Sequence, residues 1–419
     1  MASTNTFNKA SWVAMKGLVL LTSELAIGAL CDPQYSGEYA QKFAIGKTLT
    51  IPLSQRYIPQ SNNMAYNAQA LDRPYTTLTM DQTLTTPFQW EDVEKALDME
   101  RGEDRVEKIY VRPAVNYHRQ GIENYFATFC YQNANMVVGA LGTNPTTFDG
   151  TSAAALQNLA EMDCPTDDGE LGLVLPPPVI RAVRVSNQTD FNPAADVSKQ
   201  IRTGMIGTSD SFDWYRSNSL ITHTAGTWAG SVTFTSGSGS SVVVACTTGD
   251  TFNPGDKFSI ADVNQVNQMT RQTTGTSAAG TKTFTVLQPV TGTGSAATLT
   301  VYPPIYGPGS QYQNVDALPA AGAALTLWPG TTAPSGKSGK VGLAMHPGAF
   351  FIAGVPLEEP ESVEICRQYT DPKTGLSLRF IRQWVQWPGA APLMTNRLDN
   401  LFGAGVGLAE QEATVIACA

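Results

Sequence analysis

The segment that comes closest to a chemical motif is the loop GTTAPSGKS at Gly330–Ser338. A phosphate-binding loop follows the pattern G-x-x-x-x-G-K-S/T, because successive backbone N–H groups must curl around the phosphates. This segment has one residue too many before its Gly-Lys-Ser, and Pro334 removes one of the donors. From Gly339 onward the residues favour a strand, where the motif would begin a helix. We therefore interpret the segment as a flexible loop and expect no nucleotide or other cofactor.

Neither the histidines nor the acidic residues form a catalytic or metal-binding motif. His118, His223 and His346 stand far apart and belong to no HExxH or comparable pattern. We expect structural or surface histidines and no metal site. A glycosidase would need two carboxylates about 5–10 Å apart in a cleft, which sequence alone does not reveal. The acidic residues that are close together in the chain resemble those of solvated loops, and they are Glu91, Asp92, Asp167, Asp168, Glu358, Glu359 and Glu361.

The composition describes a large, mildly acidic protein. Its 419 residues are enough for two or three domains, and its formal net charge of -9 argues against coating a nucleic acid. The six cysteines form no CxxC pair, so we expect free buried thiols rather than a disulfide framework or a zinc site. The most apolar segment, Lys16–Leu30, is interrupted by Glu24, and we expect no membrane span. Residues 9–30 predict an amphipathic helix instead.

The strongest helix signal runs from Glu103 to Gly139. Ile122, Phe126 and Phe129 recur at helical spacing, acidic residues fill the first turn, and Gly139 is a plausible stop. Pro113 interrupts this pattern, since an interior proline costs about 3 kcal/mol. We therefore expect either a bend near residues 109–111 or a helix that starts at Arg112–Pro113.

Two strand signals upstream of this helix predict a long hairpin. Leu49, Ile51 and Leu53 alternate with polar residues, and a second alternating run covers Thr76–Leu84. The polar segment Arg56–Tyr75 joins them. Such a hairpin has too little apolar surface to be stable alone, so it must rest on its own domain or on a neighbouring subunit. Pro52 indicates that the first arm lies at a sheet edge.

The composition changes sharply at Ile221. From there to Lys340 the chain has nine charged residues and no glutamate, and Ser, Thr, Gly and Ala dominate. Short β-type runs alternate with turn signals such as Asn253-Pro254-Gly255-Asp256, which predicts an all-β module inserted into a host domain. The predicted strands are Ser231–Thr235, Val242–Ala245, Lys257–Ile260, Thr283–Leu287, Ala297–Val301 and Ala324–Leu327. Elsewhere we predict helices at Pro87–Glu100, Ser152–Asp163 and Pro177–Val185, and strands at Leu171–Pro178, Leu376–Trp387 and Ala413–Ala417.

The order of these elements resembles the major capsid proteins of tailed bacteriophages, which have the HK97-like fold. Lys47–Leu53 and Thr76–Leu84 look like the arms of that family's E-loop, and Glu103–Gly139 looks like its spine helix. The segment IRTGMIGTSDSFDWYRSNSLITHT, residues 201–224, is similar to the Gly-rich turn of the A-domain. Cys246–Gln272 looks like the core hairpin of the extra β-barrel, the I-domain, found in coat proteins of the short-tailed Salmonella phage group.

The resemblance implies an α+β fold of HK97 type with an inserted all-β barrel. It also implies self-assembly in hexamers and pentamers, a scaffolding protein, a portal at one vertex, and enclosed double-stranded DNA that is not bound specifically. The virion would be the location, after assembly in the bacterial cytoplasm. The expected division is an N-terminal arm (1–45), the E-loop (46–86), the spine helix and P-domain (87–141), the A-domain (142–221), the I-domain (222–345) and the returning A- and P-domain strands (346–419).

In this interpretation the hairpin lies across a neighbouring copy. We expect Arg56, Asp72 and Arg73, near its tip, to form ion pairs between subunits, because the tip has no core of its own. No catalytic residue is expected. Two alternatives stay open at this point, a tail-associated or surface β-module that binds a ligand, such as an adhesin, and a hydrolase that uses some of the scattered carboxylates.

Overall fold

The computed structural model describes residues 9–23, 25–35, 48–58, 74–90, 111–186, 208–228, 231–274, 280–328, 336–360, 363, 365–371, 374–385 and 393–419. The chain forms two compact units. Unit 1 comprises Met1–Ile51, Thr76–Phe126 and Phe350–Gly405, and unit 2 comprises Pro52–Tyr75, Ala127–Ala349 and Val406–Ala419. Each unit therefore combines segments that are far apart in the sequence.

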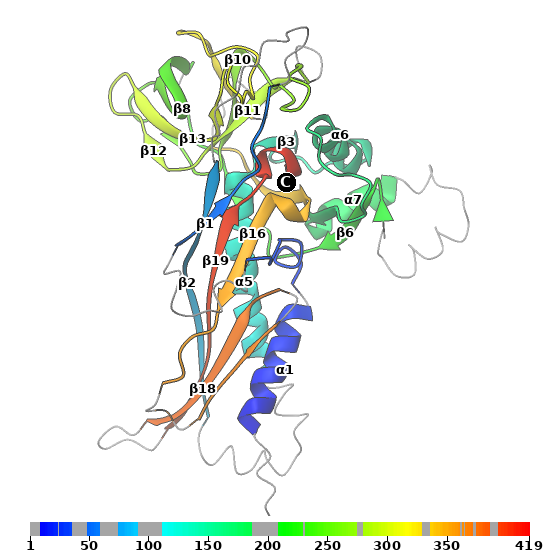
Figure 1. The fold of residues 1–419 in the computed structure, drawn as a ribbon, viewed down its shortest axis with the longest axis vertical. Helices are drawn as coiled ribbons and strands as arrows, with labels where there is room; N and C mark the ends of the chain where they lie inside the picture. Colours follow the sequence, from blue (N-terminus) through cyan, green and yellow to red (C-terminus); the bar gives the residue numbers. More distant parts are fainter. Residues whose placement is uncertain are drawn as a thin grey trace, which may run out of the picture. The chain divides into compact units, whose positions relative to one another are not determined.

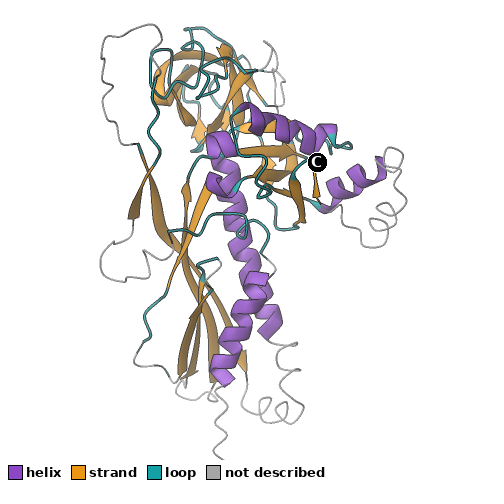
Figure 2. Ribbon diagram, turned by 45° about the vertical axis from the view of Figure 1, so that its right-hand side comes forward, coloured by secondary structure: helices purple, strands orange, loops and turns teal. Residues whose placement is uncertain are grey.

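Unit 1 is built on a six-stranded sheet in the order β1-β2-β19-β18-β17, with β16 also paired to β19. The long strands β2, β19 and β18 are antiparallel and run beside helix α5 (Figures 1 and 2). The strands are β1 (Thr48–Pro52), β2 (Tyr75–Trp90), β16 (Phe350–Val355), β17 (Ile365–Thr370), β18 (Ser377–Val385) and β19 (Leu393–Val406).

Two helices supply the other side of the unit 1 core. Helix α1 (Lys9–Ser23) contacts β17 and β18, and its Gly17 faces Leu378 of β18 and Val115 of α5 (Arg112–Asn133). Phe126 of α5 is fully buried and lies against Phe402 of β19, with ring centroids 5.6 Å apart. Helix α1 ends at Ser23, earlier than the predicted residue 30, and turns follow it.

The predicted hairpin is present at its base, but its second arm is longer than expected. Strands β1 and β2 are neighbours, and β1 is the terminal strand of the order, as Pro52 indicated. Strand β2 continues to Trp90, so the helix predicted at Pro87–Glu100 is wrong at its start, where Pro87 pairs with Arg397. Because β1 is short, most of β2 forms an edge of the described sheet, where a proline is tolerated. Residues 91–100 lie outside the described residues.

The described part of the long helix is α5, whose bounds begin at Arg112 and leave Pro113 in the first turn, where proline is accepted. Val111, directly before it, is π-helical, and residues 101–110 lie outside the described residues. Whether the helix bends near residues 109–111 or starts at Arg112–Pro113 therefore stays a prediction. The predicted end at Gly139 is wrong. The helix ends at Asn133, and Met136–Gly139 forms strand β3, which pairs with β20 (Ala413–Ala417).

Unit 2 contains a seven-stranded sheet in the order β3-β20-β15-β4-β6-β5, with β7 also paired to β15. Helices α6 (Ala154–Glu161) and α7 (Pro177–Ser186) contribute to its apolar core, which includes Leu159, Val179 and Val183. The remaining elements of this part are β4 (Gly172–Leu175), β5 (Thr208–Ser209), β6 (Phe212–Arg216), β7 (Thr222–Thr224), β15 (Ser338–Met345), α9 (Ala409–Glu412), a π-helical turn at Asp149–Ala153 and a 3-10 helix at Pro347–Ala349.

Between β7 and β15 the chain forms a second sheet, which we call the β-module (residues 225–337). Its strand order is β14-β10-β11-β13-β8, and hydrogen bonds from Leu325 to Val232 and from Phe234 to Ala323 join the two end strands, so the sheet closes into a barrel. The strands are β8 (Thr233–Ala245), β10 (Lys257–Asn264), β11 (Thr281–Val286), β13 (Ala297–Ile305) and β14 (Leu325–Leu327), with a separate pair β9 (Thr251–Phe252) and β12 (Val290–Thr291).

The period-2 pattern of the sequence explains this barrel. Phe258 and Ile260 of β10, Phe284 and Val286 of β11 and Leu299 of β13 are fully buried. Along β13, buried residues alternate with partly or fully exposed ones. The chain enters and leaves the β-module through one antiparallel pair, in which Thr224 faces Ser338 and Thr222 faces Lys340. Strand β15 then pairs with β4 and β20 of the seven-stranded sheet, although the expected division placed its residues in the I-domain.

No helix among the described residues combines the length and the apolarity that are needed to cross a membrane.

Candidate functional site

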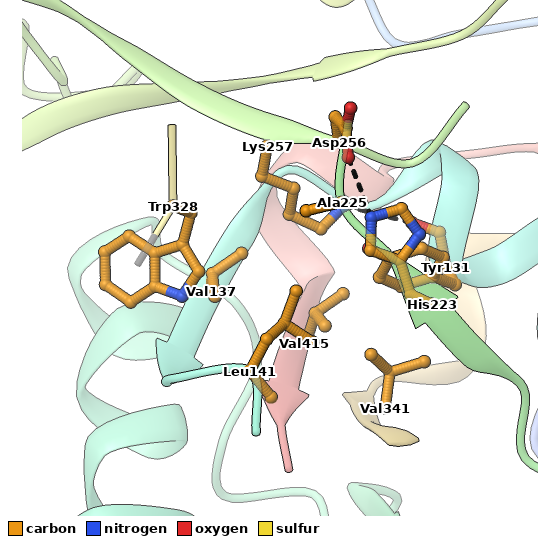
Figure 3. Close-up of a pocket in the computed structure, with 11 residues that line it drawn as sticks. Tyr131, Val137, Leu141, His223, Ala225, Asp256, Lys257, Trp328, Val341 and Val415 are labelled. Carbon is orange, nitrogen blue, oxygen red and sulfur yellow. Dashed lines mark hydrogen bonds and ion pairs between the residues drawn. The ribbon is translucent and has the colours of Figure 1, made fainter. Parts of the chain in front are cut away.

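The described residues that carry the most unusual chemistry lie where the β-module joins the rest of unit 2. We call Tyr131, His223, Asp256 and Lys257 the mount (Figure 3). Tyr131 comes from the last turns of α5, His223 from β7, and Asp256 and Lys257 from the turn that leads into β10. Figure 3 shows these polar groups on one side of a small cavity and the apolar Val137, Leu141, Val341 and Val415 around the rest.

Lys257 caps the C-terminal end of helix α5. Its Nζ donates to the carbonyl oxygens of Tyr131 (3.0 Å) and Ala134, and to Oγ1 of Thr285 (3.1 Å). The last carbonyls of a helix lack partners within the helix, and a cation there is favoured by the helix dipole. The ammonium group also lies 4.6 Å from the centre of the Tyr131 ring. Complete burial lowers the pKa of Lys257 to about 7, although the charge of Asp256 opposes this effect.

Asp256 organises the entry to the β-module. Its carboxylate accepts hydrogen bonds from Nε2 of His223 (2.8 Å), from the backbone N–H of Gly226 (3.0 Å) and from that of Asn253 (2.7 Å). The Tyr131 hydroxyl donates to the carbonyl oxygen of Gly255 at 2.8 Å. The mount therefore leaves none of these side-chain groups without a partner, as a buried polar network must to be stable.

The turn at Asn253–Asp256 explains why the sequence requires a glycine here. Gly255 has φ +92°, and a Cβ at this position would come within 2.4 Å of Cε1 of Tyr131. Only glycine allows both the left-handed backbone and the close approach of the aromatic ring. The turn signal Asn-Pro-Gly-Asp thus marks the contact between the β-module and α5.

The cavities next to the mount do not provide a catalytic arrangement. The cavity of Figure 3 has a volume of about 10 Å³, which is room for about one water molecule. A larger cleft of about 410 Å³ lies between α6 and one face of the barrel, with Ser259, Thr283 and Thr326 in one row across three strands. Glu161 is the one carboxylate that lines it among the described residues, and neither histidine nor cysteine does.

A second set of charges joins the β-module to helix α9. Nζ of Lys282, in β11, lies 2.6 Å from Oε1 of Glu410, and Nδ2 of Asn314 donates to the same oxygen at 2.9 Å. Lys282 is completely buried. Burial would raise the pKa of Glu410, but the charge and hydrogen bond of Lys282, with smaller effects of Arg56 and Asn314, lower it.

His346 lies among three carboxylates, those of Asp168, Glu170 and Glu412. Its Nδ1 lies 3.2 Å from Glu412, its Nε2 lies 2.9 Å from Asp168, and Glu170 is 4.0 Å away. The hydrogen bond to Glu412, together with that to Asp168, raises the pKa of His346 to about 9 in spite of partial burial. Asp168, Glu170 and His346 are close enough to hold a metal ion. An imidazolium that faces carboxylates through both nitrogens is, however, a donor and not a ligand.

The residues singled out from the sequence fall in different places. Arg56 lies over the ring of Tyr312 of the same chain, 5.9 Å from its centre, whereas Asp72 and Arg73 lie outside the described residues. His118 is buried and bonded to Thr86 (2.9 Å), so all three histidines contact structural partners. After Gly336-Lys337 the chain forms strand β15, as the sequence predicted, where a phosphate-binding loop would lead into a helix.

Sequence reasoning missed Asp256, Lys257, Lys282 and Glu410. One signal was available for two of them, since Asp256 and Lys257 are adjacent charges at the start of an apolar strand in a segment that is otherwise poor in charge. Lys282 and Glu410 are far apart in the chain, and no local pattern connects them.

Comparison with known proteins gives one match by sequence. Residues 220–336 match the family model described as P22 coat protein, gene protein 5, and this range coincides with the β-module and its entry strand β7. The resemblance noted in the sequence is thereby confirmed for this segment. No curated protein matches the chain.

Among solved structures, the chain is similar to one from Mycobacterium phage Che8, with 12% identity, a TM-score of 0.47, and coverage of 94% of this chain and 91% of that chain. It is similar to the capsid structure of the cyanophage P-SCSP1u, with 10% identity, a TM-score of 0.42 and coverages of 90% and 85%. It is also similar to the mature capsid of bacteriophage PhiM1, with 8% identity, a TM-score of 0.41 and coverages of 90% and 83%.

Proposed function

We propose that this chain is a structural protein that builds a closed shell from many copies of itself. More specifically, it is the major capsid protein of a tailed bacteriophage, with an HK97-like fold and an inserted β-barrel like that of the P22 coat protein. The observation that carries the proposal is the match of residues 220–336 to the P22 coat protein model. It covers the β-module alone, which enters and leaves its host sheet through the β7–β15 pair.

The rest of the chain supports the same function by its construction. The hairpin of β1 and β2 has polar arms and contributes few apolar side chains, with Ile51, Leu78 and Met80 as its buried residues. In the proposal a second copy supplies the surface on which the hairpin rests, and contacts of this heterologous kind close into rings and shells. The net charge of -9 is compatible with a shell that encloses DNA without binding it tightly.

The proposal includes the partners of such a shell. The copies form hexamers and pentamers, a scaffolding protein directs their assembly, a portal occupies one vertex, and double-stranded DNA is enclosed without specific binding. Assembly takes place in the cytoplasm of the host bacterium. The protein has no catalytic role, and Asp72 and Arg73, in the segment that joins the two arms, form ion pairs between subunits. Arg56 belongs to the same set, but its place over Tyr312 means that its substitution acts on the hairpin root as well.

Electron microscopy of the expressed protein tests the proposal. The full chain, produced together with the scaffolding protein of its phage, is expected to form closed particles in negative stain. A matched variant in which residues 59–73 are replaced by a short Gly-Ser turn keeps β1, β2 and Arg56 and is expected to stay unassembled. A wild-type chain that remains a soluble monomer at high concentration with scaffold present would refute the function.

Charge reversal at Asp72 or Arg73 tests the proposed contacts between subunits separately. Asp72→Arg or Arg73→Glu is expected to lower particle yield at least about tenfold, because like charges would face each other across the interface. Asp81→Arg, at an exposed position of β2, serves as the control. Unchanged particle yield in both charge-reversal variants would contradict the proposed ion pairs, whereas the proposed shell would not be affected.

A further inference from the structure

Glu410 connects the β-module to a segment that lies about 100 residues or more away in the sequence. It lies in α9, and its Oε1 receives both Nζ of Lys282 (2.6 Å) and Nδ2 of Asn314 (2.9 Å). Lys282 belongs to β11, and Asn314 to the loop between β13 and β14. One carboxylate of the C-terminal helix thus holds a strand and a loop of the barrel.

The same loop receives the root of the hairpin, residues 53–58. The guanidinium of Arg56 lies 5.9 Å from the centre of the Tyr312 ring, while the next residue, Tyr57, is 63% exposed. Arg56 therefore turns inward where its neighbour turns to solvent. Burial lowers the pKa of Arg56, and the charge of Glu410 is the largest effect that opposes this.

The loop that carries Tyr312 is itself fixed. Arg271 donates from its two terminal nitrogens to the carbonyl oxygens of Ser310 and Gln311, each at 3.0 Å. Asn314 closes the other end by donating to the carbonyl oxygen of Pro304 at 2.8 Å, in addition to its bond with Glu410. The loop is thus held on both sides of Tyr312 by hydrogen bonds of Arg271 and Asn314.

Glu410 binds Lys282 directly, and through Asn314 it also binds the loop on whose tyrosine ring Arg56 lies. Lys282 is completely buried and Arg56 is partly buried. A buried cation is tolerated only where an opposite charge and hydrogen bonds replace its water. Glu410 therefore supports Arg56 through the loop of Asn314 and Tyr312, and its negative charge favours the Arg56 cation in the same place.

We infer that Glu410 is a positioning residue that couples the hairpin root to the β-module. The position of the hairpin root, residues 53–58, is thereby set inside each copy, before any second copy is met. That consequence for assembly rests on the proposed function, whereas the coupling itself is a property of the single chain.

Hydrogen exchange on the full-length, unassembled chain tests the coupling. The reporter is the hairpin root, where the Leu53 amide donates to the carbonyl oxygen of Pro74 at 2.8 Å. Glu410→Gln is expected to speed exchange of residues 53–58 at least about tenfold, because the root loses the charge that holds Arg56. Glu412→Gln is the matched control, since it makes the same change on the same helix but faces His346.

Glu410→Gln also leaves Lys282 without its ion pair, which would loosen the whole barrel. The chain with both Lys282→Met and Glu410→Gln removes that cost, and its root is still expected to exchange faster than that of Lys282→Met alone. Arg56→Gln should produce the same acceleration, and adding it to Glu410→Gln should produce no more. Root exchange that is equal in Lys282→Met and in the double variant would overturn the coupling.

The outcome is independent of shell formation. If the wild-type chain forms no shells, the proposed function fails while the exchange result is unaffected. If shells form and the root exchanges alike with and without Glu410, the function stands and the coupling is wrong.

Discussion

Two buried polar regions of this protein are built in opposite ways. In the mount of unit 2, the carboxylate of Asp256 accepts and the ammonium group of Lys257 donates several hydrogen bonds. In unit 1, Thr86, His118, Asn396 and Asn400 form what we call the seam, between α5 and the strands β2 and β19. Nε2 of His118 and the side-chain atoms of Asn396 and Asn400 are buried and have no hydrogen-bond partner among the described residues.

The contrast shows what each region specifies. A saturated network in a low-dielectric interior holds one geometry, because every displacement breaks a bond that water does not replace. An unsaturated layer of polar groups costs stability in the arrangement seen and opposes a small shift of the helix much less. The mount therefore fixes the β-module on α5, whereas the seam holds α5 on its sheet mainly through shape and apolar contacts such as Phe126 with Phe402.

The largest expected effect is at the centre of the mount. Asp256→Ala removes the acceptor of two backbone N–H groups and of His223, and leaves Lys257 buried without its nearest carboxylate. Loss of one member of such a network costs about 3–5 kcal/mol in the free energy of unfolding. Urea denaturation followed by tryptophan fluorescence measures it, with Asp81→Ala in an exposed part of β2 as the control. A loss below about 1 kcal/mol would show that the mount is not the fixed point described here.

The second expected effect is an opposite response of two histidines to pH. The pKa of His346 is raised to about 9 by Glu412 and Asp168, so its contribution is complete below the unfolded value near pH 6.5 and is lost as the pH rises toward 9. Burial lowers the pKa of His118 to about 4, against smaller effects of Asn400 and Asp399. The contribution of neutral His118 is therefore complete above pH 6.5 and is lost as the pH falls toward 4.

Substitution by glutamine separates these contributions from the other titrating groups. The stability difference between wild type and His346→Gln should shrink by about 1–2 kcal/mol from pH 6.5 to 9, a value reduced for the partial exposure of the site. The difference for His118→Gln should shrink by about 2–3 kcal/mol from pH 6.5 to 4. Lys257, with its pKa of about 7, titrates in both chains of each comparison and cancels. If both stability differences changed in the same direction with pH, the opposite roles of His346 and His118 would be contradicted.

The sequence predicted those elements whose signal is local. Strand β20 has the predicted bounds Ala413–Ala417, helix α7 lies where Pro177–Val185 was expected, and β13 contains the predicted Ala297–Val301, although the two runs Ser231–Thr235 and Val242–Ala245 join into one strand, β8. In each case a few neighbouring side chains carry enough information to fix the conformation.

The sequence did not predict features that depend on distant partners. Strand β2 continues through Pro87 because β19, about 300 residues later, pairs with it. Helix α5 ends at Asn133, where Lys257 binds its last carbonyl oxygens, and not at the glycine that a local rule favours. The ion pair of Lys282 with Glu410 likewise exists only once the barrel and α9 meet, so no spacing rule reveals it.

The smallest effect has the opposite sign, and it tests the seam directly. Asn396 is completely buried on β19, opposite Phe88 of β2, and both polar atoms of its amide lack partners. Leucine has nearly the same shape, so Asn396→Leu removes two unsatisfied groups without leaving a cavity, and we expect the free energy of unfolding to rise by about 1 kcal/mol. The matched change in the mount, Asp256→Leu, should destabilise strongly because its partners would lose their acceptor. A clear loss of stability in Asn396→Leu would mean that ordered water satisfies the amide, and the seam would then be a bonded layer like the mount.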